Sequence, residues 1–242
     1  MPRQQQSARP ARRRSYDQFC PAARALDSVG DRWTLLIVRE LLAGPRRYTD
    51  LHADLPGVST DVLASRLRDM EQGGLAVRRR LPPPAAAAVY ELTERGRGLL
   101  PVLAALAEWG APALGEHRPT DAVRAHWFAL PLLRVLGGLA HGGLLDVRLP
   151  EGEFHIRTGA EAEGGAVYGY GPADRPDACL VLGAEAALDL ARGACALAEA
   201  VADGRAEVLG EGPLADGLRG GRPLEPDVSG SCTSDAFQPT RR

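Results

Sequence analysis

The sequence predicts an α+β protein built of two domains. Apolar residues recur at helical spacing through the first half, where one pair of short strands interrupts them, whereas strands and short helices fill the second half. The charge also changes sign between the two halves: the formal net charge is +5 over residues 1–118 and −7 over residues 119–242. A basic half joined to an acidic half indicates that one domain meets a polyanion, although the five arginines of the N-terminal stretch account for the excess by themselves.

The composition is that of a globular protein, since 45% of the 242 residues are hydrophobic and 25% are charged. No apolar run reaches the roughly 18 residues that a membrane span needs. A secretory signal has an apolar core after its basic region. The basic stretch "MPRQQQSARPARRRS" is not followed by one. We therefore expect a cytoplasmic protein without a membrane partner. The four cysteines lack CxxC spacing, so neither a zinc site nor a disulfide framework is expected.

The first half is expected to contain five helices and one hairpin after a disordered basic tail over residues 1–15. Gly44–Pro45 ends the second helix, and Asp31 and Ser59 stand where they can cap the second and the fourth. Pro101 should kink the last helix. The expected helices span 20–30, 32–44, 48–55, 59–72 and 94–114, and the expected strands span 75–81 and 88–92.

The helix expected over 59–72 is amphipathic. On a helical wheel, Leu63, Leu67 and Met70 form a stripe that should be buried. The opposite side carries small and polar residues, which would let another backbone approach closely: Asp61, Ser65 and Arg68, with Ala64 and Arg66 to either side. A face that meets only solvent would fit the same residues, so this helix alone leaves both interpretations open.

The order of these elements is that of a winged helix-turn-helix. In such a unit the second helix of the motif enters the major groove of DNA and the hairpin, or wing, lies on the backbone, where arginines neutralise phosphates. Arg78 and Arg80 share one face of their strand and Arg79 points the other way, so at least one is expected to be a structural surface charge. The residues predicted to contact DNA are Ser59, Thr60, Asp61, Ala64, Ser65, Arg66, Arg68, Arg78, Arg79 and Arg80.

Several pieces of the first half resemble one family: "CP" before the first helix, "DRWTLLIVREL", "GPRRYTDL", "VSTDVLASRLRDMEQGGL" and "YELTERG". Over residues 16–115 the chain closely resembles the HxlR-type transcriptional regulators, relatives of the MarR group. The resemblance implies a DNA-binding and dimerisation domain that acts as a homodimer on a pseudo-palindromic operator in double-stranded DNA, dimerised through its N- and C-terminal helices. An apolar run suits that interface, although core packing explains it equally well: Leu99, Leu103, Leu106 and Trp109.

Two departures from the family concern the operator. Asp61 stands where many members carry a basic residue, and it would repel phosphate unless it accepts a hydrogen bond from a cytosine amino group. The wing tip "PPPAAAA" lacks the charge that is usual there. Because of both departures, the operator sequence cannot be inferred from the family, but the expectation that the chain binds DNA is unchanged.

Some HxlR-type regulators have a redox- or electrophile-sensitive cysteine at the position of Cys20. The resemblance therefore implies that Cys20 is a candidate sensor. The start of a helix favours the reactive thiolate, and Arg24 lies one turn along. A structural thiol that packs against Trp33 or Tyr16 is the alternative.

The second half is expected to form a mixed α/β domain over 122–219, after a linker over 115–122 and before a disordered tail over 220–242. A change of period from helical to alternating marks a hairpin around Glu151–Gly152. The expected helices span 122–140, 184–193, 195–204 and 213–220, and the expected strands span 144–150, 153–159, 166–172, 178–183 and 205–212.

The stretch from "PDACLVLG" to "GEGPLADGL", with its "ADGR" turn, resembles the sterol-carrier-protein type-2 fold. The resemblance implies a lipid-like ligand held between a sheet and helices, that is, a small apolar molecule. Its predicted contacts are Trp127, Phe128, Tyr168 and Tyr170. Aromatic residues of a small domain also serve as plain core, and this alternative stays open.

No catalytic motif accompanies these features. The five histidines form neither HExxH nor a cluster with metal spacing, and GxSxG, the P-loop and GxGxxG between strand and helix are all missing. We expect no enzyme activity, no cofactor and no metal. The leading hypothesis is a DNA-binding repressor whose C-terminal domain senses a small apolar ligand. The alternatives are a redox regulator that acts through Cys20 and a lipid carrier that uses the winged domain for dimerisation.

Overall fold

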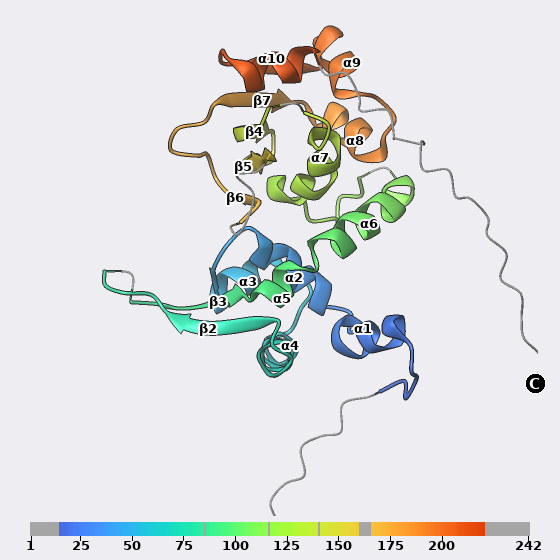
Figure 1. The fold of residues 1–242 in the computed structure, drawn as a ribbon, viewed down its shortest axis with the longest axis vertical. Coiled ribbons are helices and arrows are strands. Elements are labelled where there is room, and N and C mark those ends of the chain that lie inside the picture. The colour runs from blue at the N-terminus through green and yellow to red at the C-terminus, as the bar shows by residue number, and fades with distance from the viewer. Residues whose placement is uncertain (1–14, 85, 116, 140, 160–165, 221–242) are drawn as a thin grey trace, which may run out of the picture.

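The computed structural model of the chain describes residues 15–84, 86–115, 117–139, 141–159 and 166–220. Two units stack on one another: a mainly helical N-terminal unit with a small sheet, and a C-terminal unit built on a larger sheet (Figure 1). The disordered tails predicted for 1–15 and 220–242 lie outside the described residues, except at positions 15 and 220.

The N-terminal unit has the predicted order of helices followed by a hairpin. Its sheet is antiparallel with the strand order β1-β3-β2. The two-residue strand β1 was not predicted, because it is too short to show a period. The elements are α1 (Pro21–Val29), α2 (Thr34–Leu42), β1 (Arg46–Arg47), α3 (Tyr48–Asp54), α4 (Thr60–Gln72), β2 (Ala76–Arg80), β3 (Ala88–Leu92), α5 (Glu94–Arg97), α6 (Leu100–Gly110) and the 3₁₀ helix η1 (Ala111–Ala113).

The core of this unit confirms the predicted stripe of α4. Leu63, Leu67 and Met70 are buried, and they belong to the same core as Ile37 of α2 and Leu51 of α3. Truncation of a leucine in such a site typically costs about 2–5 kcal/mol of the free energy of unfolding. The position of α4 is therefore fixed mainly by its inner side.

Two local predictions were wrong. Asp31 does not cap α2, because the helix begins at Thr34 and the Asp31 carboxylate instead accepts a hydrogen bond from Arg66. The single helix expected over 94–114 is divided at Gly98, so that Pro101 falls in the first turn of α6 and kinks nothing. Proline is favoured in a first turn, since the N–H that it lacks has no helical partner there.

The C-terminal unit is one five-stranded sheet with the order β6-β5-β4-β7-β8, in which only β4 and β7 run parallel. Its helices gather beside one face of the sheet (Figure 1). The helix expected over 122–140 is shorter and begins as a 3₁₀ turn. The elements are η2 (Ala125–Phe128), α7 (Ala129–Leu136), β4 (Gly143–Leu149), β5 (Gly152–Thr158), β6 (Tyr168–Tyr170), β7 (Ala178–Leu182), α8 (Ala184–Arg192), α9 (Leu197–Ala202), β8 (Ala206–Leu209) and α10 (Pro213–Gly220).

Alternation in these strands divides the sheet into two faces. Leu145, Val147, Phe154, Ile156 and Leu180 are fully buried, as period-two patterning against a core requires. The intervening residues of β5, His155 and Arg157, are only half-buried and lie on the opposite face. No helix of the described residues is long and apolar enough to cross a membrane.

A buried polar cluster joins the two units. Glu40 of α2 accepts hydrogen bonds from His126 Nε2 at 2.7 Å, Trp127 Nε1 at 2.9 Å and the Tyr170 hydroxyl at 2.9 Å. Arg39 adds a bond at 2.9 Å to the same carboxylate. Burial alone would raise the pKa of Glu40, but the hydrogen bond from His126 and the positive charges of Arg39 and His126 outweigh it, so the pKa lies below its usual value.

Candidate nucleic-acid interface

The outer side of α4 is the centre of the candidate interface. Ser59 caps the helix, and its hydroxyl oxygen accepts a hydrogen bond from the backbone N–H of Val62 at 3.3 Å. The Tyr48 hydroxyl, at the start of α3, donates to the carbonyl of Thr60 at 2.8 Å and so fixes α4 against the preceding helix. The helix lies at the end of the molecule away from the C-terminal unit (Figure 1), and the first residues of its outer side are exposed.

The structure brings most of the predicted DNA contacts together on that side. Ser59, Thr60, Asp61 and Arg68 are exposed, whereas Ala64, Ser65 and Arg66 are half-buried. The Arg68 Nε donates to the carbonyl of Ala64 at 3.2 Å, which holds the guanidinium group along the helix.

Arg66 differs from Arg68 in its partners. Its guanidinium pairs with Asp31 and with Asp69, the latter at 3.1 Å, and only 23% of its side chain is exposed. Arg66 therefore ties α4 to the segment before α2 in this conformation. A base contact from Arg66 would require these ion pairs to open first.

The wing carries its three arginines on two faces, as predicted. Arg78, Arg79 and Arg80 are all exposed on β2, and alternation separates the middle one from its neighbours. Arg79 pairs with Glu91 of β3 at 2.5 Å, so it is the arginine with a structural role. Arg78 and Arg80 have no ion-pair partner within the described part of the chain.

Sequence reasoning missed Arg47 as a candidate for phosphate contact. It is exposed on β1 and pairs in register with Val89, which pairs with Arg79 on the other side, so the three residues lie in one row across the sheet. The signal was the "RR" pair before the third helix, which sequence reasoning took for a loop.

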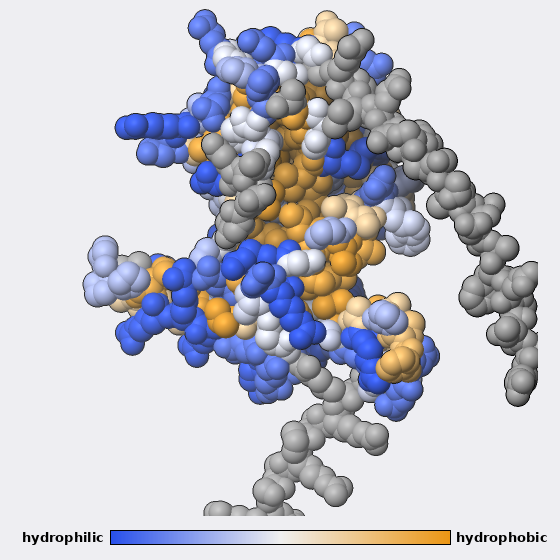
Figure 2. Space-filling view, viewed as in Figure 1, coloured by the Kyte–Doolittle hydropathy of each residue, from blue (hydrophilic) through white to orange (hydrophobic). Residues whose placement is uncertain are grey.

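Exposed apolar residues lie on α6 and around α1. Trp109 keeps 84% of its surface exposed, and Leu106, Phe19 and Leu26 are also exposed. In Figure 2, hydrophobic residues gather in the middle of the view between the two units, and around α1 they are mixed with hydrophilic ones. Of the apolar run predicted for an interface, Leu103 is buried in the core, Leu99 is half-buried, and Leu106 and Trp109 are exposed.

Cys20 occupies the N-cap position of α1 and is a half-buried free thiol. Its side chain makes no capping hydrogen bond. The predicted position at a helix start is therefore correct.

Three of the four predicted ligand contacts, Trp127, Tyr168 and Tyr170, lie where the two units meet. Trp127 and Tyr170 donate to Glu40, and the Tyr168 hydroxyl donates to the carbonyl of Arg39 at 2.5 Å. Burial, reinforced by the negative charge of Glu40, raises the pKa of both tyrosines. Phe128 is half-buried and packs against the core.

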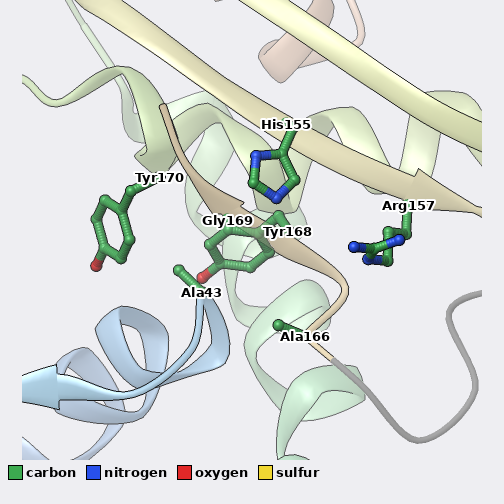
Figure 3. A pocket seen from close by; sticks show the side chains of 7 residues that line it. All are labelled: Ala43, His155, Arg157, Ala166, Tyr168, Gly169 and Tyr170. Atoms are coloured by element: carbon green, nitrogen blue, oxygen red, sulfur yellow. The ribbon is translucent and has the colours of Figure 1, made fainter. Parts of the chain in front are cut away.

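An open cavity of about 600 Å³ lies beside two of these residues (Figure 3). Tyr168 and Tyr170 line it, whereas Trp127 and Phe128 do not. Within the described residues, no group of three or more His, Cys, Asp and Glu side chains is placed to hold a metal ion.

A helix-turn-helix with a basic wing, whose second helix turns a small polar side outward, defines a winged helix-turn-helix DNA-binding protein. Residues 28–118 match the HxlR-like helix-turn-helix family. The chain is 36% identical over 96 residues to the uncharacterized HTH-type transcriptional regulator YvaP of Bacillus subtilis. The aligned region spans 39% of this chain and 89% of YvaP. The protein belongs to the HxlR-like family of DNA-binding transcriptional regulators, which confirms the resemblance of its first half.

YodB of Bacillus subtilis, an HTH-type transcriptional regulator, is another relative, 34% identical over 92 residues that span 38% of this chain and 82% of YodB. The solved structure of its reduced form covers 43% of this chain and 100% of its own, with 31% identity and a TM-score of 0.36. The family match ends at residue 118, so it does not extend to the C-terminal unit.

Proposed function

We propose that the protein is a repressor that binds a pseudo-palindromic operator in double-stranded DNA as a homodimer. The observation that carries this proposal is the small polar outer side of α4 together with Arg78 and Arg80 of the wing, which are exposed and have no ion-pair partner among the described residues. In this mode Ser65 and Arg68 contact base edges, and the wing neutralises phosphates.

Binding to DNA is tested by fluorescence anisotropy with the DNA upstream of the protein's own gene. Affinity should fall steeply with salt, and Arg80→Ala should weaken binding to all sequences alike while it lowers the salt slope by about 1. Arg175→Ala, an exposed arginine of the C-terminal unit, is the matched control. Salt-insensitive binding, or none, would instead favour a lipid carrier in which the winged domain serves only dimerisation.

The homodimer rests on the exposed apolar surface of α6 and α1. A large exposed aromatic residue such as Trp109 is costly to leave in water, and a second copy of the chain would cover it. Trp109→Glu should therefore halve the mass measured by light scattering. Leu209→Glu, at an exposed apolar position on β8, should leave the mass unchanged.

We propose further that the C-terminal unit, residues 122–219, is a sterol-carrier-like domain that senses a small ligand and that the protein has no enzymatic activity. A five-stranded sheet with helices on one face supports this reading. A ligand that binds one arrangement of the dimer more tightly than another would change the spacing between its two winged helix-turn-helix domains. A redox switch at Cys20 is the alternative means of regulation, and operator release by peroxide in the native protein but not in Cys20→Ser would favour it.

A further inference from the structure

We propose that the cavity between the end of α2 and the edge of the sheet binds an organic anion, a carboxylate with an apolar body. This inference rests on the proposed function only where it concerns regulation of DNA binding. The cavity holds about 600 Å³, enough for a small organic molecule, and both units line it (Figure 3). Ala43 comes from the end of α2, and the other lining residues come from β5, β6 and the residue Ala166 before β6.

The positive charge in the cavity comes from Arg157. It is half-buried, it lines the cavity, and within the described residues its guanidinium has no hydrogen-bond or ion-pair partner. The other arginines near the junction differ, since Arg39 pairs with Glu40, and Arg46 and Arg124 both pair with Asp54. A guanidinium presents a planar fork of donors that matches a carboxylate, so an anion would supply the partner that the described residues do not.

His155 stands two residues before Arg157 on β5 and lines the same cavity. Its Nδ1 lies 3.0 Å from the carbonyl oxygen of Gly171. Because a carbonyl only accepts, Nδ1 carries the proton, and Nε2 of the neutral ring can only accept a hydrogen bond, so the carboxylate is bound by Arg157 and not by this nitrogen. The ring lies over Gly169 of β6, where an added Cβ would come within 2.4 Å of Nε2. Any larger residue at 169 would displace the imidazole, so glycine at this position keeps His155 in place.

The rest of the lining favours an apolar body. The hydroxyls of Tyr168 and Tyr170 are already bonded to the Arg39 carbonyl and to Glu40, so these residues have no free hydroxyl to offer. Ala43 and Ala166 contribute methyl groups. One cationic end and one apolar end within the same cavity select an amphipathic anion over inorganic phosphate or a neutral lipid.

The same strand connects the cavity to the DNA-binding unit. β6 contributes Tyr168, Gly169 and Tyr170 to the lining, and its two tyrosines bond to α2, whose Ile37 shares a core with the inner side of α4. Ala43 is followed directly by the turn into β1 of the winged sheet. A bound anion would thus press on both sides of the junction, and binding of anion and DNA would influence each other by the same factor.

The experiment is isothermal titration calorimetry of the full-length protein with octanoate. Arg157→Ala should weaken binding by about tenfold or more, since a charge-assisted pair is lost, and Arg157→Lys should restore part of it. Arg148→Ala removes an exposed arginine of β4 on the same face of the sheet, which already pairs with Glu153, and should leave the affinity unchanged. Octanamide and inorganic phosphate should each bind far more weakly than octanoate.

Equal binding of octanoate to the native protein and to Arg157→Ala, or equal loss in both arginine variants, would overturn the site. If inorganic phosphate bound as tightly as octanoate, the claim that the cavity selects an anion with an apolar body would be wrong. Thermal unfolding of each variant shows whether it is folded. DNA affinity is measured separately with and without octanoate: a protein that binds octanoate but no DNA would contradict the proposed function and leave the anion site standing, whereas DNA binding indifferent to octanoate would contradict only the coupling.

Discussion

Arg66 and Arg68 lie two positions apart on α4, and both are predicted from the sequence to contact DNA. In the folded chain their partners differ: Arg66 is paired with Asp31 and Asp69, whereas Arg68 is exposed and, among the described residues, is bonded only to the carbonyl of Ala64. Helical spacing predicts which side of a helix a residue occupies, but not which partner from a distant segment will reach it. Arg68 is therefore the arginine of this helix that can reach a base without first losing an ion pair.

Arg68→Ala should weaken binding to the specific operator by about 1–3 kcal/mol, because a base contact is lost. Binding to DNA of random sequence should change much less. The ratio of the two dissociation constants, measured by anisotropy at one fixed salt concentration, is the quantity to compare between the native protein and the variant. An equal loss on both DNAs would mean that Arg68 contacts phosphate and reads no base.

Glu40 shows a second limit of residue-level reasoning. It is a single acid among apolar residues on α2, and sequence patterning alone gives it no role. Its partners His126, Trp127 and Tyr170 come from the other unit and lie more than 80 positions away in the sequence. A charged residue inside an apolar helix was the available signal, since a buried carboxylate requires partners.

At the scale of elements, sequence patterning predicted most of the fold. Each helix of the N-terminal motif and each strand of the larger sheet has a period, a cap or a glycine that marks it, as Ser59 does for α4. The failures were elements in which local signals are weak or misleading. Strand β1 is two residues long, and the break between α5 and α6 falls at Gly98, where the apolar period continues unbroken.

Gly96 of α5 explains why this short helix sits against the wing. A Cβ at this position would lie 2.1 Å from the carbonyl oxygen of Leu75, in the backbone that leads into β2. Gly96→Ala should therefore lower the free energy of unfolding by about 1–3 kcal/mol, the usual cost of overpacking. Gly110→Ala, in α6, meets nothing within 4 Å and should be neutral or mildly stabilising. Urea denaturation measures both, and equal effects would contradict the close packing of α5.

At the scale of the whole molecule, the sequence separated the two halves but did not place one on the other. Charge and period marked the change near residue 118, and the family match ends there as well. The contact between the units depends on a few polar groups from distant segments, and no local pattern encodes such a contact. The predicted aromatic contacts of a ligand, Trp127 and Tyr170, take part in this junction.

The junction should make stability depend on pH in the acid range. The pKa of Glu40 lies below its ordinary value of 4.5 in the folded protein, so its charged form stabilises the fold at higher pH. That contribution is complete above the unfolded-state pKa and is lost as the pH falls through the folded-state value. The free energy of unfolding should therefore drop more between about pH 6 and pH 3 in the native protein than in Glu40→Gln. Parallel pH profiles would contradict a stabilising charge at the junction.

The most direct measurement concerns Ser65, at the centre of the outer side of α4. Ser65→Glu would place a carboxylate in the groove that this side is proposed to enter, where it repels the phosphates and finds few donors. Specific operator binding, followed by anisotropy, should be lost by about a hundredfold or more, while the temperature of thermal unfolding stays that of the native protein. Operator binding at native affinity by this folded variant would contradict the assignment of α4 to the DNA groove.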